Sequence, residues 1–215
     1  DEPHLNMYLK SFGKMHKAKL DTAYNCLPET SSIFTKELEI YDWGCGQGIA
    51  TICLLDFLKS KNIDYELLQI NLVEPSVPAS ERAKEVIACF DENIKVNVIN
   101  KVFDDLEEDD FNCSDVEKIH LFSNILDVET FDLAQFIHLF QNLFSGANYF
   151  ICVGPYYSND RRVDEFVAAT EPDDIYATFN KGRGMWKGDC TISLRVFFKQ
   201  FVKVEDVQDI RNRIE

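Results

Sequence analysis

The stretch YDWGCGQGIAT, residues 41–51, decides the fold. Three glycines stand at alternate positions, Gly44, Gly46 and Gly48, directly after an apolar strand pattern, and a run with helical spacing follows them. Glycine lets the backbone adopt unusual dihedral angles and approach a ligand without a Cβ in the way. The turn after the first strand of an open α/β sheet lies at its carboxyl edge, where ligands bind. We therefore predict a strand, a ligand-binding turn and a helix, with the carboxylate of Asp42 beside the turn.

Short apolar runs alternate with segments of helical spacing along the rest of the chain. We expect strands at 38–43, 67–73, 94–99, 118–123 and 149–153, and helices at 49–60, 79–90, 130–144 and 160–169. Thr130 is the expected cap of its helix, and after Pro172 two strand patterns joined by a Gly-rich turn indicate an antiparallel hairpin. Parallel neighbours need a crossover long enough to hold a helix, so the alternation predicts an α/β fold with a doubly wound, mostly parallel, seven-stranded sheet.

The chain is expected to form one domain, 1–215. Its 215 residues, of which 46% are hydrophobic, suit a single core, and no linker rich in Pro, Gly or Ser divides them. We divide the domain into an N-terminal helical extension (1–37), a ligand-binding core (38–154), and a C-terminal helix and hairpin (155–215). The first residue is Asp1 rather than Met, which suggests a piece excised from a larger protein.

The formal net charge of −15 disfavours direct nucleic-acid binding, because phosphates are repelled by an acidic surface. Basic residues gather only at 10–19, expected as the solvated face of a helix or as a partner contact, and at 181–187. Neither a long apolar run nor a signal-peptide pattern is present, so we expect a soluble, cytoplasmic protein without membrane contact. The seven cysteines form no CxxC pair, which predicts buried thiols rather than a metal site or disulfides.

The spacing of the glycine turn distinguishes among possible ligands. A dinucleotide site requires G-x-G-x-x-G, but Ile49 stands at the third glycine position. A phosphate-binding P-loop requires Gly-Lys-Ser or Gly-Lys-Thr, and neither follows. Asp42 would repel a diphosphate, whereas it suits a ligand with a positively charged amino group.

The pattern D-x-G-x-G-x-G, from Asp42 to Gly48, resembles the first motif of the class I S-adenosylmethionine-dependent methyltransferases, a Rossmann-like family. The resemblance implies a Rossmann-like fold with S-adenosylmethionine as the cofactor. It also implies that the glycine loop, with Gly44, Cys45, Gly46 and Gly48, holds the methionyl part, while Asp42 places its ammonium group directly or through water. The alternative is a Gly-rich turn that serves only close packing of strand and helix.

Further residues extend the resemblance. Glu74 ends the second strand and resembles the ribose-binding acid of the family, since a carboxylate can accept both hydrogen bonds of a diol; Pro75 would then border the adenine. The alternative for Glu74 is a capping or surface charge. Many family members carry an Asp after the third strand, where this chain has Val102 or Phe103. We expect Phe103 to stack on or wall the base while Asp104 or a backbone amide reads its edge, or else a solvated acidic loop.

Asn124 follows the fourth strand, where the family places its fourth motif close to the methyl group. No Asn-Pro-Pro-Tyr, Asp-Pro-Pro-Tyr or Pro-Cys sequence is present, so a nucleic-acid base methylase is not indicated. Methyl transfer from a sulfonium needs chiefly alignment and exclusion of water, and we assign no catalytic residue. His120 and His138 are interpreted as satisfied core histidines.

The acceptor is expected to be a small molecule or a protein, with Tyr156 and Tyr157 as candidate contacts after the fifth strand. In the last turn we expect Arg183, with Lys181 and Lys187, to contribute to a surface for a negatively charged acceptor or partner, with Trp186 as its apolar anchor. The alternative is a hairpin whose Trp packs back on the sheet.

Two other classes of protein compete with this interpretation. One is a non-catalytic, methyltransferase-like binding or interaction module within a larger protein. The other is a nucleotide-dependent oxidoreductase, which the misplaced third glycine disfavours.

Overall fold

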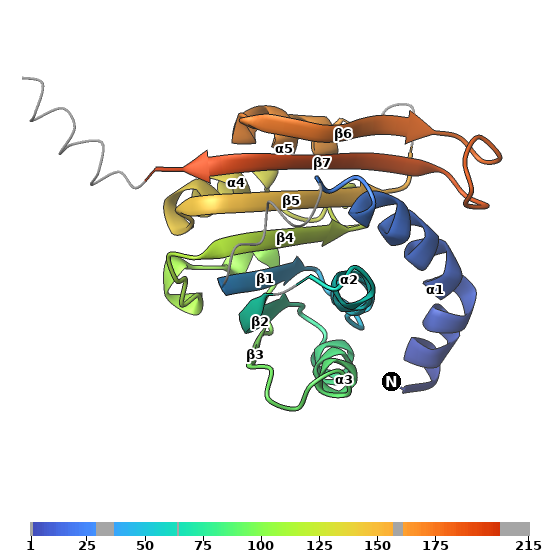
Figure 1. Cartoon of the computed structure of the whole chain (residues 1–215), viewed down its shortest axis with the longest axis horizontal. Coiled ribbons are helices and arrows are strands. Elements are labelled where there is room, and N and C mark those ends of the chain that lie inside the picture. Colours follow the sequence, from blue (N-terminus) through green and yellow to red (C-terminus); the bar gives the residue numbers. More distant parts are fainter. Residues whose placement is uncertain (1, 29–36, 64, 157–160, 203–215) are drawn as a thin grey trace, which may run out of the picture.

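The computed structural model describes residues 2–28, 37–63, 65–156 and 161–202 (Figure 1). These residues form one seven-stranded sheet with the strand order β3-β2-β1-β4-β5-β7-β6. The strands are β1 (Glu37–Trp43), β2 (Glu66–Val73), β3 (Val96–Ile99), β4 (Glu117–Ser123), β5 (Gly146–Gly154), β6 (Asp174–Lys181) and β7 (Ile192–Phe201). The helices are α1 (Glu2–Tyr24), α2 (Ile49–Ser60), α3 (Val77–Ala88), α4 (Leu133–Leu143) and α5 (Arg162–Thr170), with short 3₁₀ turns η2 (Phe103–Asp105) and η3 (Glu108–Asp110).

The pairing of the strands confirms the predicted fold class. Strands β1 to β5 pair in parallel, whereas β7 pairs antiparallel with both β5 and β6. The expected C-terminal hairpin is therefore present, and its second strand lies inside the sheet between β5 and β6. Order reverses between β1 and β4, so the turn after β1 lies at a topological switch point.

Helices cover both faces of the sheet. Figure 1 shows α1, α2 and α3 on one face and α4 and α5 on the other. Aliphatic side chains dominate the core under α1 to α3, while the core under α4 and α5 is largely aromatic. At its centre the fully buried Trp43 stacks on Phe122, with ring centroids 5.9 Å apart. Both faces of β1 are thus buried, as expected for a central strand of a parallel sheet.

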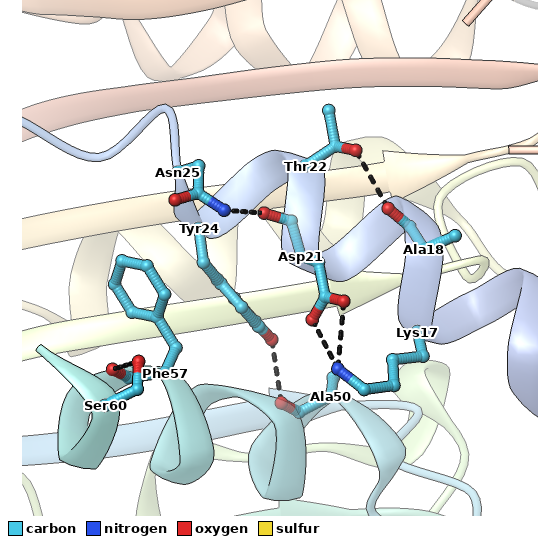
Figure 2. Close-up of polar contacts among 9 residues, drawn as sticks. All are labelled: Lys17, Ala18, Asp21, Thr22, Tyr24, Asn25, Ala50, Phe57 and Ser60. Carbon is cyan, nitrogen blue, oxygen red and sulfur yellow. Dashed lines mark hydrogen bonds and ion pairs between the residues drawn. The ribbon is translucent and has the colours of Figure 1, made fainter. Parts of the chain in front are cut away.

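The second half of α1 anchors this helix on α2. Figure 2 shows the hydroxyl of the fully buried Tyr24 donating a hydrogen bond to the Ala50 carbonyl at 2.7 Å, and the Lys17–Asp21 ion pair within α1 at 2.8 Å. The first half of α1 runs past the carboxyl ends of the parallel strands (Figure 1) and carries exposed Met7 and Phe12. This half places side chains over the glycine turn.

Two local predictions were wrong and one is confirmed. Asp132, not Thr130, caps α4, because its carboxylate accepts hydrogen bonds from the backbone N–H groups of Ala134 and Gln135. His138 is exposed on α4 rather than buried in the core. His120 is fully buried between Trp43 Nε1 and Asn148 Oδ1, and burial lowers its pKa to about 3.

Four of the seven cysteines are buried as predicted, Cys89 is exposed, and the other two are half-buried. Within the described ranges, no helix combines the length and the apolar character needed to cross a membrane.

Candidate functional site

The three glycines of the turn have different surroundings. All three have positive φ angles, 66° at Gly44, 51° at Gly46 and 75° at Gly48. A Cβ at Gly44 would lie 2.7 Å from the Ile125 side chain, and one at Gly48 would lie 2.9 Å from the Cβ of Ala83 on α3. A Cβ at Gly46 would meet no atom of the protein within 4 Å. Gly44 and Gly48 thus permit close packing, whereas Gly46 borders open space.

That open space is a cavity of about 200 Å³, which we call the Gly46 cavity. Its floor is formed by residues 44–47 and the start of α2, its side by Ser123 and Asn124, and its roof by Leu5, Tyr8 and His16 of α1. Gly44, Cys45, Gly46 and Asn124 are the predicted site residues among its lining. The other predicted cofactor residues are not part of this lining, namely Asp42, Gly48, Glu74, Pro75, Phe103 and Asp104.

Asp42, in β1, is hydrogen-bonded to Thr51 at the start of α2, on the other side of the glycine turn. Its Oδ2 accepts hydrogen bonds from the backbone N–H of Thr51, at 3.2 Å, and from the Thr51 hydroxyl, at 2.7 Å. The side chain is 1% exposed, and burial raises the pKa of its carboxyl to about 6, against the lowering effect of the Thr51 hydrogen bonds. The nearby charge of Glu74 raises this pKa further. Asp42 therefore ties β1 to α2 and does not line the Gly46 cavity.

Glu74 connects the ends of the first two strands. Its Oε2 accepts a hydrogen bond from Gly46 N–H at 3.0 Å, and its Oε1 accepts one from Ser76 N–H at 2.9 Å. Each carboxylate oxygen has a further lone pair, so Glu74 can accept additional hydrogen bonds. Pro75 is exposed directly beside it. The carboxylate thus lies next to the one glycine of the turn that borders open space.

Phe103 and Asp104 both make structural contacts. The Phe103 ring is buried, 4.8 Å from the Phe131 ring and 4.9 Å from the Phe136 ring, measured between centroids. One carboxylate oxygen of Asp104 accepts a hydrogen bond from Asp132 N–H at 2.8 Å. Phe103 is too buried to stack on a base, whereas Asp104 is exposed and its assignment stays a prediction.

Sequence reasoning missed a polar network that joins α1 to the end of β4. Lys19 Nζ donates to Asn124 Oδ1 at 3.2 Å, Asn124 Nδ2 lies 2.8 Å from His16 Nδ1, and His16 Nε2 lies 3.0 Å from the Tyr8 hydroxyl. An ammonium only donates, so Asn124 must present its oxygen to Lys19 and its amide N–H to His16. His16 Nδ1 then accepts, and Nε2 carries the proton toward Tyr8.

His16, at the centre of this network, is neutral at pH 7. Burial, helped by the Lys19 charge, lowers the pKa of His16 to about 4, so the imidazole is neutral. Asn124 has a φ of 57°, which directs its side chain from the end of β4 toward α1. The signal in the sequence was the spacing of His16 and Lys19 beside the buried Leu20 and Ala23, on one face of α1.

A second cavity, of about 470 Å³, adjoins the first, and both are lined by Tyr8, His16 and Asn124. We call it the Lys19 cavity. Among the residues predicted to contact the acceptor, Arg183 is part of its lining. Tyr156 follows the lining residue Pro155 and is exposed, while Tyr157 lies outside the described residues.

Trp186 packs back on its own hairpin, as the alternative interpretation expected. Its Nε1 donates a hydrogen bond to the Cys190 carbonyl at 2.6 Å, and the side chain packs against the aliphatic core. Lys181 and Lys187 line one cavity together with Trp186, and Lys181 also lies over the Phe179 ring at 4.9 Å. The expected convergence of Trp186 with Arg183 on one surface is not observed in the lining of the Lys19 cavity.

No protein-family model matches the chain, and no curated protein sequence matches it significantly. Solved structures do match. A Listeria monocytogenes protein assigned to the class I S-adenosylmethionine-dependent methyltransferases shares 16% identity and a TM-score of 0.52, covering 87% of this chain and 61% of that protein. Precorrin-6y C5,15-methyltransferase of Geobacter metallireducens gives 12% identity and a TM-score of 0.54, with 84% and 87% covered.

A third match is a Streptococcus mutans protein assigned as a methyltransferase and solved in complex with S-adenosylhomocysteine. It gives 10% identity and a TM-score of 0.50, covering 84% of this chain and 98% of that protein. At such identities the likeness concerns the fold. The chain has the fold of the class I S-adenosylmethionine-dependent methyltransferases.

Proposed function

We propose that this chain binds S-adenosylmethionine at the glycine turn and transfers its methyl group to an acceptor. The observation that carries the proposal is the open space beside Gly46 at the switch point of a sheet whose fold matches solved methyltransferases. The complex of the Streptococcus mutans protein with S-adenosylhomocysteine supports it, since that protein shares the fold.

The residues around the turn suit this cofactor. The backbone at Gly44, Cys45 and Gly46 would hold the methionyl part, and the remaining lone pairs of Glu74 would accept hydrogen bonds from the ribose hydroxyls. The Gly46 cavity, about 200 Å³, is smaller than the roughly 300–1,000 Å³ of typical small-molecule sites. The nucleoside would therefore extend past Glu74 toward the exposed Pro75.

The charges at the turn favour a cation. Asp42 and Glu74 both lie at the turn, and the pKa of Asp42 is raised chiefly by burial and to a smaller extent by the charge of Glu74. A sulfonium cofactor with an ammonium group would offset this repulsion, whereas a diphosphate would increase it. The electrostatics thus support S-adenosylmethionine over a dinucleotide.

When bound, the cofactor supplies a methyl group on a sulfonium, which needs no metal or nucleophilic side chain to become reactive. The chain has to align the acceptor and exclude water. Helix α1 covers the Gly46 cavity with Leu5, Tyr8 and His16, and Asn124 connects this roof to β4. These residues would close the site around the transferred methyl group.

Calorimetric titration with S-adenosylmethionine and S-adenosylhomocysteine, with NAD as the control, tests the proposal. We expect both sulfur ligands to bind and NAD not to bind. Gly46→Val should abolish binding by filling the space beside the turn. Gly184→Val is the matched control, because Gly184 also has a positive φ, 75°, and open space around it, but lies in the exposed turn before β7.

The proposal fails if wild-type protein gives no heat with either sulfur ligand at millimolar concentration. It also fails if Gly46→Val binds as tightly as wild type, since the turn would then serve packing alone. Binding without any methyl transfer would identify the chain as a binding module.

A further inference from the structure

The Lys19 cavity lies where a second ligand would be next to one in the Gly46 cavity. It shares Tyr8, His16 and Asn124 with the Gly46 cavity, so a molecule in one cavity would lie beside a molecule in the other. Apolar side chains form much of its wall, namely Phe12, Met15 and Pro155. A cavity of about 470 Å³ lies within the range of small-molecule sites.

Lys19 is the unusual group in this cavity. The residue is 1% exposed, and among the described residues its ammonium donates one hydrogen bond, to Asn124 Oδ1. An ammonium has three donors, and buried donors are normally paired. Burial lowers the pKa of Lys19, and the negative charge of Asp127 opposes this effect. Two N–H groups of a buried cation thus remain available at the cavity wall.

The lining carries net positive charge within a chain whose formal net charge is −15. Lys19 and Arg183 are its cations and Asp127 is its anion. Burial lowers the pKa of His16 and raises the pKa values of Tyr8 and Cys190. These three lining side chains are therefore neutral at pH 7. Lys19 is thus the buried cation of this lining, while Arg183 is exposed.

The two cations of the cavity differ in exposure, since Arg183 is exposed and Lys19 is buried. The Arg183 side chain is 75% exposed and lies 4.0 Å from the exposed Asp189, so it stands at the mouth. Lys19 lies next to Asn124, on the side that borders the Gly46 cavity. An anion held by Lys19 would therefore lie near the cofactor, while Arg183 would attract it from solution.

We propose that the Lys19 cavity is the acceptor site, and that the acceptor is a small molecule with an apolar, aromatic body and a reactive oxygen anion, a carboxylate or phenolate, bound by Lys19. This inference rests on the proposed function. In the reaction, a lone pair of the acceptor oxygen forms the bond to the methyl carbon as the carbon–sulfur bond breaks. The electron pair of that bond stays on sulfur, the charges of anion and sulfonium cancel, and no proton moves.

The first test compares four probes of similar size on wild-type protein loaded with S-adenosylhomocysteine, with binding measured by ligand-observed NMR. Benzoate and 4-nitrophenolate are the anions, benzamide the neutral probe and benzylamine the cation. We expect at least one anion to bind about tenfold or more tightly than benzamide and benzylamine, because a hydrogen bond to a buried charge contributes about that factor. The two anions distinguish a carboxylate acceptor from a phenolate acceptor.

The second test removes the cation. Lys19→Met should abolish the preference for the anion, and Lys19→Gln should do so while leaving S-adenosylhomocysteine affinity within about twofold, since it retains a donor for Asn124 in the lining of the Gly46 cavity. Lys17→Met is the matched control, because Lys17 lies on the same helix and pairs with Asp21 on the exposed surface. Lys19→Gln, which retains a donor for Asn124, replaces Lys19→Met if the latter lowers the melting temperature.

The outcomes separate the two proposals. If S-adenosylhomocysteine does not bind to wild-type protein, the proposed function fails. If it binds but the anions bind no more tightly than benzamide, or Lys19→Met and Lys19→Gln keep the preference, the acceptor inference fails alone. Formation of the methyl ester or ether from the preferred anion and S-adenosylmethionine, detected by mass spectrometry, would complete the assignment.

Discussion

Asp42→Asn should make the protein more stable at neutral pH. The asparagine Oδ1 can still accept the two hydrogen bonds from Thr51, while the buried charge is removed. Burial raises the pKa of Asp42 from 3.8 to about 6 in the folded protein, so the folded state holds this proton more tightly than the unfolded chain. Its contribution to stability is therefore fully present below pH 3.8 and is lost as the pH rises through 6.

The magnitude follows from the two pKa values. At about 1.4 kcal/mol per pKa unit, the ionised Asp42 lowers the free energy of unfolding by about 3 kcal/mol at neutral pH. The sequence pI is about 4.6, so precipitation restricts measurements to higher pH. About half of this loss of stability develops below pH 5 and the other half between pH 5 and pH 8. The stability difference between Asp42→Asn and wild type should therefore grow by about 1.5 kcal/mol from pH 5 to pH 8.

Urea denaturation of both proteins, followed by circular dichroism across this pH range, measures the difference directly. Asp91→Asn is the control, because Asp91 is exposed and hydrogen bonds from Asn93 lower its pKa, so its carboxylate should favour folding at higher pH. A difference between Asp42→Asn and wild type that stays constant with pH would show that Asp42 is not a strained buried acid. A decrease with rising pH would show that its pKa is lowered.

Three further substitutions test the packing around the site. Gly48→Ala should lower the free energy of unfolding by about 1–3 kcal/mol, because φ is 75° and the new Cβ would lie 2.9 Å from that of Ala83; unchanged stability in urea would mean that α3 can move away. Tyr24→Phe should lower it by about 1–2 kcal/mol, since the Ala50 carbonyl loses a buried partner, and a smaller loss would indicate that water replaces the hydroxyl. Trp186→Ala should lower the melting temperature and leave S-adenosylhomocysteine affinity unchanged; the converse result would make Trp186 a ligand contact.

The order of strands and helices could be predicted from the sequence because it rests on local periodicity. Alternating and helical patterns each depend on near neighbours in the chain, and the observed bounds differ from the expected ones by a few residues. The glycine turn was recognisable for the same reason. Errors remained where neighbouring residues offer the same chemistry, as when Asp132 rather than Thr130 caps α4.

The composition of the site was decided by the tertiary structure. His16 and Asn124 are 108 residues apart in the chain, and only the path of α1 across the carboxyl edge brings them within hydrogen-bond distance. Phe103 was taken into the aromatic core by Phe131 and Phe136, partners that the pattern around it does not reveal.

The glycine turn shows the same division within a few residues. The sequence by itself determined that a tight turn follows β1, since three alternate glycines permit positive φ angles. It could not determine which glycine borders open space, because that depends on Ile125 packing at Gly44 and Ala83 packing at Gly48. Side chains distant in the chain fill the space at two glycines, and the third borders open space.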